Sequence, residues 1–129
     1  MHQTYDHCRL QNFRWRPERI LASFEVLDQN NNIHEVYIQT RAERLYTDLA
    51  ELAKGKRTQG IFSCGMTDID FFRMAEGGVM LAWSPNEVTQ INYILPAGEL
   101  QKLIDWAATI PKRCSEGFRT TSLSESTNK

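Results

Sequence analysis

The two carboxylates best placed to act together are Asp68 and Asp70, which are two residues apart in a strand-like stretch. Residues i and i+2 of a strand point to the same side, so these side chains would share one face. Paired carboxylates can act as general acid and base or hold magnesium, but those roles need a cleft and usually a third ligand. They can equally contact a basic partner. Together with Glu76 and Glu87, which the same sheet can carry, they form the predicted partner-binding surface.

A second group with recognisable chemistry is the run Phe13, Arg14, Trp15 and Arg16. Single-stranded nucleic acids are bound by aromatic rings that stack on bases, beside arginines that hold phosphate. The same pattern is also typical of an edge strand whose tryptophan packs inward while its arginines keep the edge soluble. Binding of single-stranded nucleic acid is therefore the alternative function, although the chain as a whole is not basic.

One segment resembles the beginning of a calcium loop, with oxygen-bearing side chains at Asp28, Asn30 and Asn32. The match fails at Ile33, where that loop needs glycine, and at Gln39, where it needs a bidentate acid. The Asn-rich segment is instead typical of a hairpin turn, since Asn and Asp tolerate left-handed backbone. We therefore predict a turn here and no calcium site.

The histidines and cysteines form no metal or nucleophile site in the sequence. His2, His7 and Cys8 lack a fourth zinc ligand and belong to a terminus that we expect to be frayed. Cys64 is the one plausible nucleophile, but the mid-chain His34 is expected on the outward face of the first hairpin. We therefore predict no enzymatic activity, no metal and no cofactor.

The composition is that of one folded domain, with 129 residues, 41% hydrophobic and 24% charged. No stretch approaches the ~20 apolar residues of a membrane span, and the first residues lack the pattern of a secretory signal. The cysteines Cys8, Cys64 and Cys114 are odd in number and widely spaced, which favours reduced thiols. These features predict a cytoplasmic protein without a membrane partner.

Charge is unevenly distributed, although the net charge is −1. Residues 1–57 carry nine basic and eight acidic side chains, residues 58–111 carry two and six, and residues 112–129 carry four and two. The near-neutral total argues against a general affinity for nucleic acid or anionic membranes. The acidic middle segment favours a basic partner.

The hydrophobic pattern predicts an α+β domain over residues 1–111, with a mainly antiparallel sheet of about six or seven strands and two helices. The helices are expected over residues 42–54, after a Thr40–Glu43 capping box, and over residues 99–110. The predicted strands cover residues 11–15, 20–26, 33–39, 60–64, 70–75, 79–83 and 90–95. Residues 112–129 are expected to be a disordered polar tail.

The Gly77-Gly78 pair predicts a tight hairpin turn. Such a turn would place Met74 opposite Leu81 and Phe72 opposite Trp83. These four side chains would then share one face of the sheet with a fifth, Val79. The second face is also rather apolar, so we expect core to cover one face and a helix or a partner to cover the other.

The motifs DFFRMAEGG (residues 70–78) and YILPAGEL (residues 93–100), with the helix that follows, resemble small bacterial immunity proteins. Those proteins neutralise toxins of contact-dependent growth inhibition and related polymorphic systems. The resemblance covers about residues 20–110 and implies a non-enzymatic cytoplasmic protein that binds a cognate toxin domain, often a basic nuclease, and blocks its active site. It transfers no catalytic or interface residues, and the near-neutral charge departs from the more acidic character of many such proteins.

The order of strands and helices also resembles the Whirly single-strand-binding fold, which repeats a unit of four strands and one helix. This resemblance concerns topology and does not fix function. It supports the alternative of nucleic-acid binding through the N-terminal strand. A homodimer remains the further alternative if no other partner binds.

Overall fold

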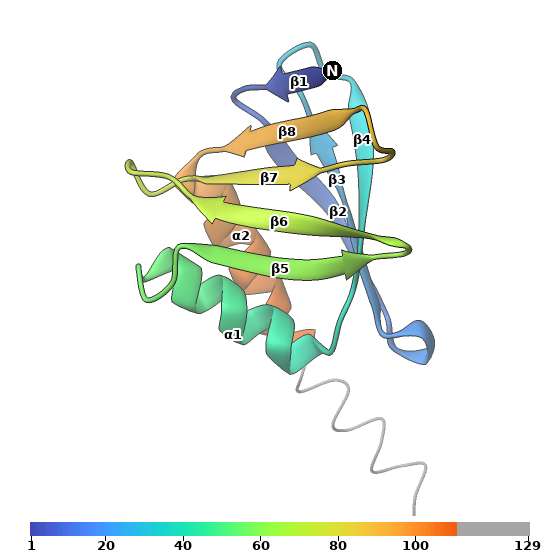
Figure 1. Cartoon of the computed structure of the whole chain (residues 1–129). Coiled ribbons are helices and arrows are strands. Elements are labelled where there is room, and N and C mark those ends of the chain that lie inside the picture. Colours follow the sequence, from blue (N-terminus) through green and yellow to red (C-terminus); the bar gives the residue numbers. More distant parts are fainter. Residues whose placement is uncertain (111–129) are drawn as a thin grey trace, which may run out of the picture.

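The computed structural model describes residues 1–110, so the expectation for residues 112–129 lies outside the described residues. Its elements are four strands, a helix, four further strands and a second helix (Figure 1). The helices are α1 (Ala42–Ala53) and α2 (Ala97–Ala107), and a 3-10 turn covers Pro17–Arg19. The strands are β1 (His2–Tyr5), β2 (Arg9–Arg16), β3 (Leu21–Leu27), β4 (Ile33–Gln39), β5 (Gln59–Cys64), β6 (Thr67–Arg73), β7 (Val79–Trp83) and β8 (Gln90–Leu95). The predicted α+β class is confirmed, with eight strands rather than six or seven.

The additional strand is β1, at the end that the sequence predicts to be frayed. It pairs in parallel with β8, where Tyr5 lies beside Tyr93. The other neighbouring strands are antiparallel, so the sheet is mixed. The amino group of Met1 donates a hydrogen bond to the carbonyl of Val88. The prediction of a frayed end was wrong because main-chain pairing holds this polar strand, and hydrophobic alternation gives no sign of such pairing.

The sheet has the strand order β1-β8-β7-β6-β5-β4-β3-β2 and changes direction between β4 and β5. These two strands share a single paired position, Gln39 with Ser63. In Figure 1, β2–β4 run crosswise to β5–β8, and both helices lie behind β5–β8. The helices pack against each other, and α2 also contacts β2 and β8. They cover the inner face of the sheet, and no helix of residues 1–110 lies on the outer face of β5–β8.

The hydrophobic core fills the space between the two helices and the inner face of the sheet. Phe62 and Phe71 meet edge to face within it, with ring centroids 5.4 Å apart. The largest fully buried side chains are Phe24, Phe62, Phe71, Ile38, Leu45, Leu49, Leu52, Ile69, Leu81, Leu95, Leu100 and Leu103. They come from both groups of strands and from both helices, so one core joins the whole described chain.

Helix α1 lies close to its predicted position, but it begins differently. Arg41 is the N-cap residue and makes no side-chain cap bond. Thr40 is only 8% exposed, and its N–H donates to the carbonyl of Ile20. The predicted capping box with Glu43 is not formed, because Thr40 extends the pairing of β3 and β4 instead. Gly55 ends the helix with a φ of +78°, a conformation that favours glycine.

The turn between β6 and β7 is longer than the two-glycine turn that the sequence predicts. Strand β6 ends at Arg73 and β7 begins at Val79, so the turn comprises residues 74–78. The N–H of Met74 donates to the carbonyl of Gly78, and the N–H of Gly77 donates back to the carbonyl of Met74. Both glycines therefore lie inside a longer turn, and this changes the register of the hairpin.

The observed register places the side chains of β6 on the opposite face, relative to those of β7, from the one predicted. Phe71 lies opposite Leu81 on the inner face, and Phe72 lies opposite Met80 on the outer face. The sequence prediction, in which Phe72 and Leu81 share a face, was wrong. A shift by an odd number of residues moves every side chain of a strand to the other side of the sheet.

Gly78 lies against the backbone of β8, and a side chain there is expected to destabilise the fold. An added Cβ would lie 2.5 Å from the carbonyl oxygen of Leu95. We expect Gly78→Ala to lower the free energy of unfolding by about 1–3 kcal/mol in urea titrations. At Gly98 in α2, an added Cβ would meet nothing in residues 1–110 within 4 Å beyond its chain neighbours and its own helix backbone, so Gly98→Ala should raise this free energy by about 0.5 kcal/mol. A Gly78→Ala variant as stable as the parent would contradict the close approach.

Candidate functional site

Asp68 and Asp70 lie on the outer face of β6, on the side of the sheet opposite the helices. Asp68 pairs across the sheet with Ser63, and Asp70 pairs with Ala82. Asp68 is exposed and Asp70 is half-buried. Within residues 1–110 neither carboxylate forms an ion pair. Burial and then the neighbouring Asp68 charge raise the pKa of Asp70 above its ordinary value.

The other two predicted contact residues lie at opposite ends of β5–β8. Glu87 lies in the connection after Trp83, at the end of the sheet where β6 begins at Thr67. Glu76 lies in the turn after β6, at the end where the guanidinium of Arg73 approaches the turn after α1. Each strand residue advances the chain by about 3.3 Å, so the length of β6 separates Glu76 from Asp68. Asp68 and Asp70 therefore share one face, Glu87 lies toward the Asp68 end of the sheet, and Glu76 lies apart at the other end.

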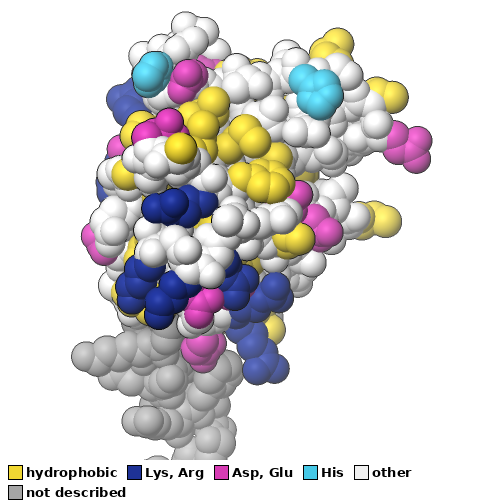
Figure 2. Space-filling view, turned by 60° about the vertical axis from the view of Figure 1, so that its left-hand side comes forward, with side chains coloured by type: hydrophobic (Ala, Val, Ile, Leu, Met, Phe, Trp, Pro, Cys, Tyr) yellow, Lys and Arg dark blue, Asp and Glu magenta, His cyan; other side chains and the backbone are white. Residues whose placement is uncertain are grey.

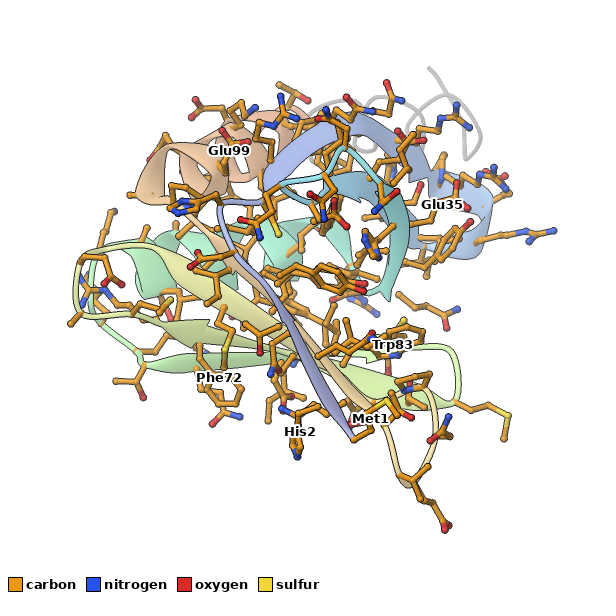
Figure 3. All side chains as sticks on the ribbon, turned by 90° about the horizontal axis from the view of Figure 1, so that it is seen from above. Met1, His2, Glu35, Phe72, Trp83 and Glu99 are labelled. Carbon is orange, nitrogen blue, oxygen red and sulfur yellow. The ribbon has the colours of Figure 1, made fainter. Side chains whose placement is uncertain are left out.

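A row of apolar side chains crosses the outer face next to the two carboxylates. It consists of Phe72, Met80 and Ile94, which are half-buried cross-strand neighbours. Phe72 lies on the side of the sheet away from the helices (Figure 3). Figure 2 shows hydrophobic side chains in the middle of one face, with Lys and Arg gathered toward its lower end. We call Asp68, Asp70, Phe72, Met80 and Ile94 the outer-face patch.

Strand β2 divides the predicted nucleic-acid-binding residues between two faces. Phe13 stacks on Trp106 of α2 with ring centroids 5.4 Å apart, and Trp15 packs half-buried against the core. Arg14 and Arg16 are exposed. This arrangement is that of an edge strand whose aromatic side chains pack inward, so the two rings and the two arginines do not form one surface.

Asp28, which the sequence offered as a calcium ligand, is the centre of a buried hydrogen-bond network. One carboxylate oxygen accepts the N–H groups of Asn30 and Asn32 at 2.8 and 3.0 Å. The other lies 2.9 Å from Nε2 of His34. The His34 bond, helped by the turn amides, lowers the pKa of Asp28 to about 2. The carboxylate is thus occupied by the turn, and residues 1–110 contain no group of three or more His, Cys, Asp or Glu placed to hold a metal ion.

His34 points inward, not outward as the sequence analysis expected. Its Nδ1 lies 3.2 Å from the hydroxyl of Tyr93. The centroid of the Tyr5 ring lies 4.6 Å from the centroid of the imidazole. The correction follows from alternation, because His34 shares its side of β4 with the buried Val36 and Ile38. Burial raises the pKa of Tyr93 to about 12, so its phenol stays protonated. The network joins the β3–β4 turn to β8 and β1.

The lowered pKa of Asp28 predicts a loss of stability in acid. The native state keeps this carboxylate ionised at a pH where the unfolded chain already binds a proton. Its stabilising effect is complete above about pH 5 and is lost as the pH falls toward 2. We expect Asp28→Asn to flatten this acid limb in urea unfolding between about pH 2 and 6. Parallel acid limbs for parent and variant would place its origin elsewhere.

A pocket that the sequence did not reveal lies between β4 and the inner face of β6–β8. It has a volume of about 130 Å³ and exists because β4 and β5 separate beyond their single paired position. Figure 3 shows Glu35 and Trp83 on this side of the molecule. The lining residues are Glu35, Val36, Tyr37, Cys64, Ile69, Trp83 and Tyr93. Burial raises the pKa of the Cys64 thiol, which makes it a poor nucleophile at neutral pH.

No protein-family model matches this chain, and neither does a curated protein or a solved structure. The resemblances to immunity proteins and to the Whirly fold are therefore carried by sequence motifs and element order alone. Within residues 1–110, neither α1 nor α2 has the length and apolar character needed to cross a membrane. The function has to be argued from the surfaces described above.

Proposed function

We propose that this chain is a non-enzymatic, cytoplasmic immunity-type protein that binds a basic toxin domain, of the nuclease kind, through the outer-face patch. The observation that carries the proposal is the pair of carboxylates Asp68 and Asp70, which lack an ion-pair partner within residues 1–110 and border an apolar row. Acidic and apolar groups side by side suit a partner that presents cations around a hydrophobic contact.

The electrostatics of the pair favour a cationic partner. The raised pKa of Asp70 reflects burial and repulsion from Asp68, and both effects oppose the ionised form. A lysine or arginine of a partner would offset the repulsion between the two carboxylates. Phe72, Met80 and Ile94 would lose their remaining exposure in the same complex, which contributes hydrophobic stabilisation.

Such a surface can inhibit a nuclease by binding alone, so the chain needs no catalytic residues of its own. A nuclease presents basic groups where it binds phosphate, and an acidic partner seated there excludes the nucleic acid. Complementary charge also accelerates the encounter of the two proteins. Glu87 extends the acidic charge at the Asp68 end, whereas Glu76 would take part only in an interface as long as β6.

Affinity purification of the tagged chain from its native cells tests the proposal. We expect one basic protein to remain bound in stoichiometric amount and to dissociate more readily as the salt concentration rises. Mass spectrometry identifies the protein, and a nuclease assay assigns its activity. A bait that retains no protein, or only nuclease-sensitive nucleic acid, would contradict the proposal.

A second candidate, the binding of single-stranded nucleic acid, is favoured by one exposed aromatic side chain. Tyr37 is 42% exposed and lies in one cross-strand row with Ser23 and Arg14. It could supply the stacking that Phe13 does not, although its hydroxyl already donates a hydrogen bond to the Glu35 carboxylate. Fluorescence anisotropy with a labelled oligonucleotide tests this function, and no binding at low salt would exclude it.

A further inference from the structure

Strand β4 is an interior strand with an open edge. It has seven residues but pairs with β5 only at Gln39. The N–H of Thr40 donates to the carbonyl of Ile20, directly before β3, so the even-numbered main-chain groups of β4 face β3 and the odd-numbered ones face the gap. Of these odd residues, Ile33 and Glu35 have no main-chain partner within residues 1–110.

The next odd residue, Tyr37, shows how the gap begins. Its N–H lies against the sulfur of Cys64, the last residue of β5. Its carbonyl has no main-chain partner within the described chain. Ile33 and Tyr37 beside this edge are 58% and 42% exposed, so no other part of residues 1–110 covers their side chains. Ordinary edge strands are protected against pairing with other chains, so unpaired main-chain groups on an interior strand are unusual.

The true edges of this sheet show such protection. At β2, the Glu99 carboxylate accepts the N–H of Leu10 at 2.8 Å, and the ammonium of Lys102 donates to the Leu10 carbonyl at 3.2 Å. A bulge with a φ of +55° at Asn12 interrupts the same strand. At the other edge, β1 has only four residues. At Ile33 and Glu35 of β4, no comparable side-chain contact covers the main chain within residues 1–110.

An additional strand paired with the open edge of β4 would point alternate side chains toward β6–β8. The pocket lies where one of these side chains would go. Val36 of β4 and Ile69 and Trp83 of the opposite layer line it. Its volume of about 130 Å³ is close to the ~150 Å³ of a cavity that accepts a benzene-sized group. One leucine or phenylalanine side chain therefore matches this space.

We propose that the β4 edge and this pocket form a slot for strand addition, which accepts an extended segment of a partner protein with one apolar side chain in the pocket. The unpaired main-chain groups bind the segment's backbone, and the pocket selects the side chain. We do not expect a second copy there, because the described strands are all held in the chain's own sheet and Glu99 and Lys102 cover the β2 edge. Inner-face residues of β6–β8 line the slot, so the proposal does not rest on the outer-face patch.

The test uses the full-length ¹⁵N-labelled chain and end-capped octapeptides in which threonine alternates with leucine or phenylalanine. In the free chain, we expect the amide of Glu35 to exchange with solvent at least about 100-fold faster than that of Val36. A peptide that binds should shift the Glu35 resonance and slow its exchange about tenfold or more. The same peptide with alternate backbone nitrogens methylated cannot donate those main-chain hydrogen bonds. It should neither shift the Glu35 resonance nor slow its exchange.

Two variants separate the slot from other sites. Cys64→Phe should fill the pocket and abolish peptide binding, whereas Ile61→Phe, on the exposed outer face, should leave it unchanged. Asp68→Lys with Asp70→Lys should also leave it unchanged, which distinguishes failure of the slot from failure of the toxin-binding proposal. A Glu35 amide already protected in the free chain, whether by its own remaining residues or by a second copy, would overturn the inference. So would equal effects of methylated and unmethylated peptides, or no peptide effect.

Discussion

Reversing Asp68 and Asp70 to lysine together is expected to slow association with the basic partner by at least about tenfold at low salt. The two carboxylates supply the negative field of the outer-face patch, and lysines would place like charges against the partner. The association rate of the parent should fall as the salt concentration rises. The association rate of the variant should change little or should rise. Association rates measured over a series of salt concentrations test this prediction.

A matched double reversal controls for net charge. Glu43 on α1 and Asp105 on α2 are exposed acidic residues on the helical side of the molecule. Their change to lysine alters the net charge by the same amount and should change the association rate much less. An equal slowing by both double variants would show that overall charge, and not the outer-face patch, controls capture.

The adjacent residues Phe71 and Phe72 are expected to respond very differently to truncation. Phe71 is 0% exposed in the core, so Phe71→Ala should lower the free energy of unfolding by about 3–5 kcal/mol. Phe72 is half-buried on the outer face, and Phe72→Ala should cost about 1 kcal/mol. Urea denaturation of both variants measures the difference.

The same pair of variants separates stability from binding. Phe72→Ala should weaken capture of the partner although the fold persists, because this ring belongs to the outer-face patch. A larger loss of stability for Phe72→Ala than for Phe71→Ala would contradict the observed register. It would instead support the hairpin pairing expected from a two-glycine turn.

The sequence predicts most elements because burial on one face imposes a regular spacing. Alternation along β3 and β4 correctly places Phe24 and Ile38 in the core, and the apolar stripe of α1 correctly includes Leu49. Register is harder to predict, because it depends on the length of the turn. The turn of residues 74–78 moved the β6–β7 pairing by three positions, and that odd number was enough to exchange the faces.

The sequence predicts only those parts of the candidate site that depend on the spacing of residues within one strand. Asp68 and Asp70 share a face because strands have a two-residue period. The separation of Glu76 follows from the length of β6, which the sequence analysis did not use. The pocket beside Trp83 depends on the parting of β4 and β5, a tertiary feature to which no spacing in the sequence corresponds.

Titration of the captured basic protein with this chain tests the central claim most directly. The protein's cleavage of nucleic acid would be measured at increasing amounts of the parent chain and of the Asp68→Lys, Asp70→Lys variant. We expect complete inhibition at a one-to-one ratio with the parent, and residual activity at the same ratio with the variant. Full activity of the bound protein at saturating parent chain would contradict the claim.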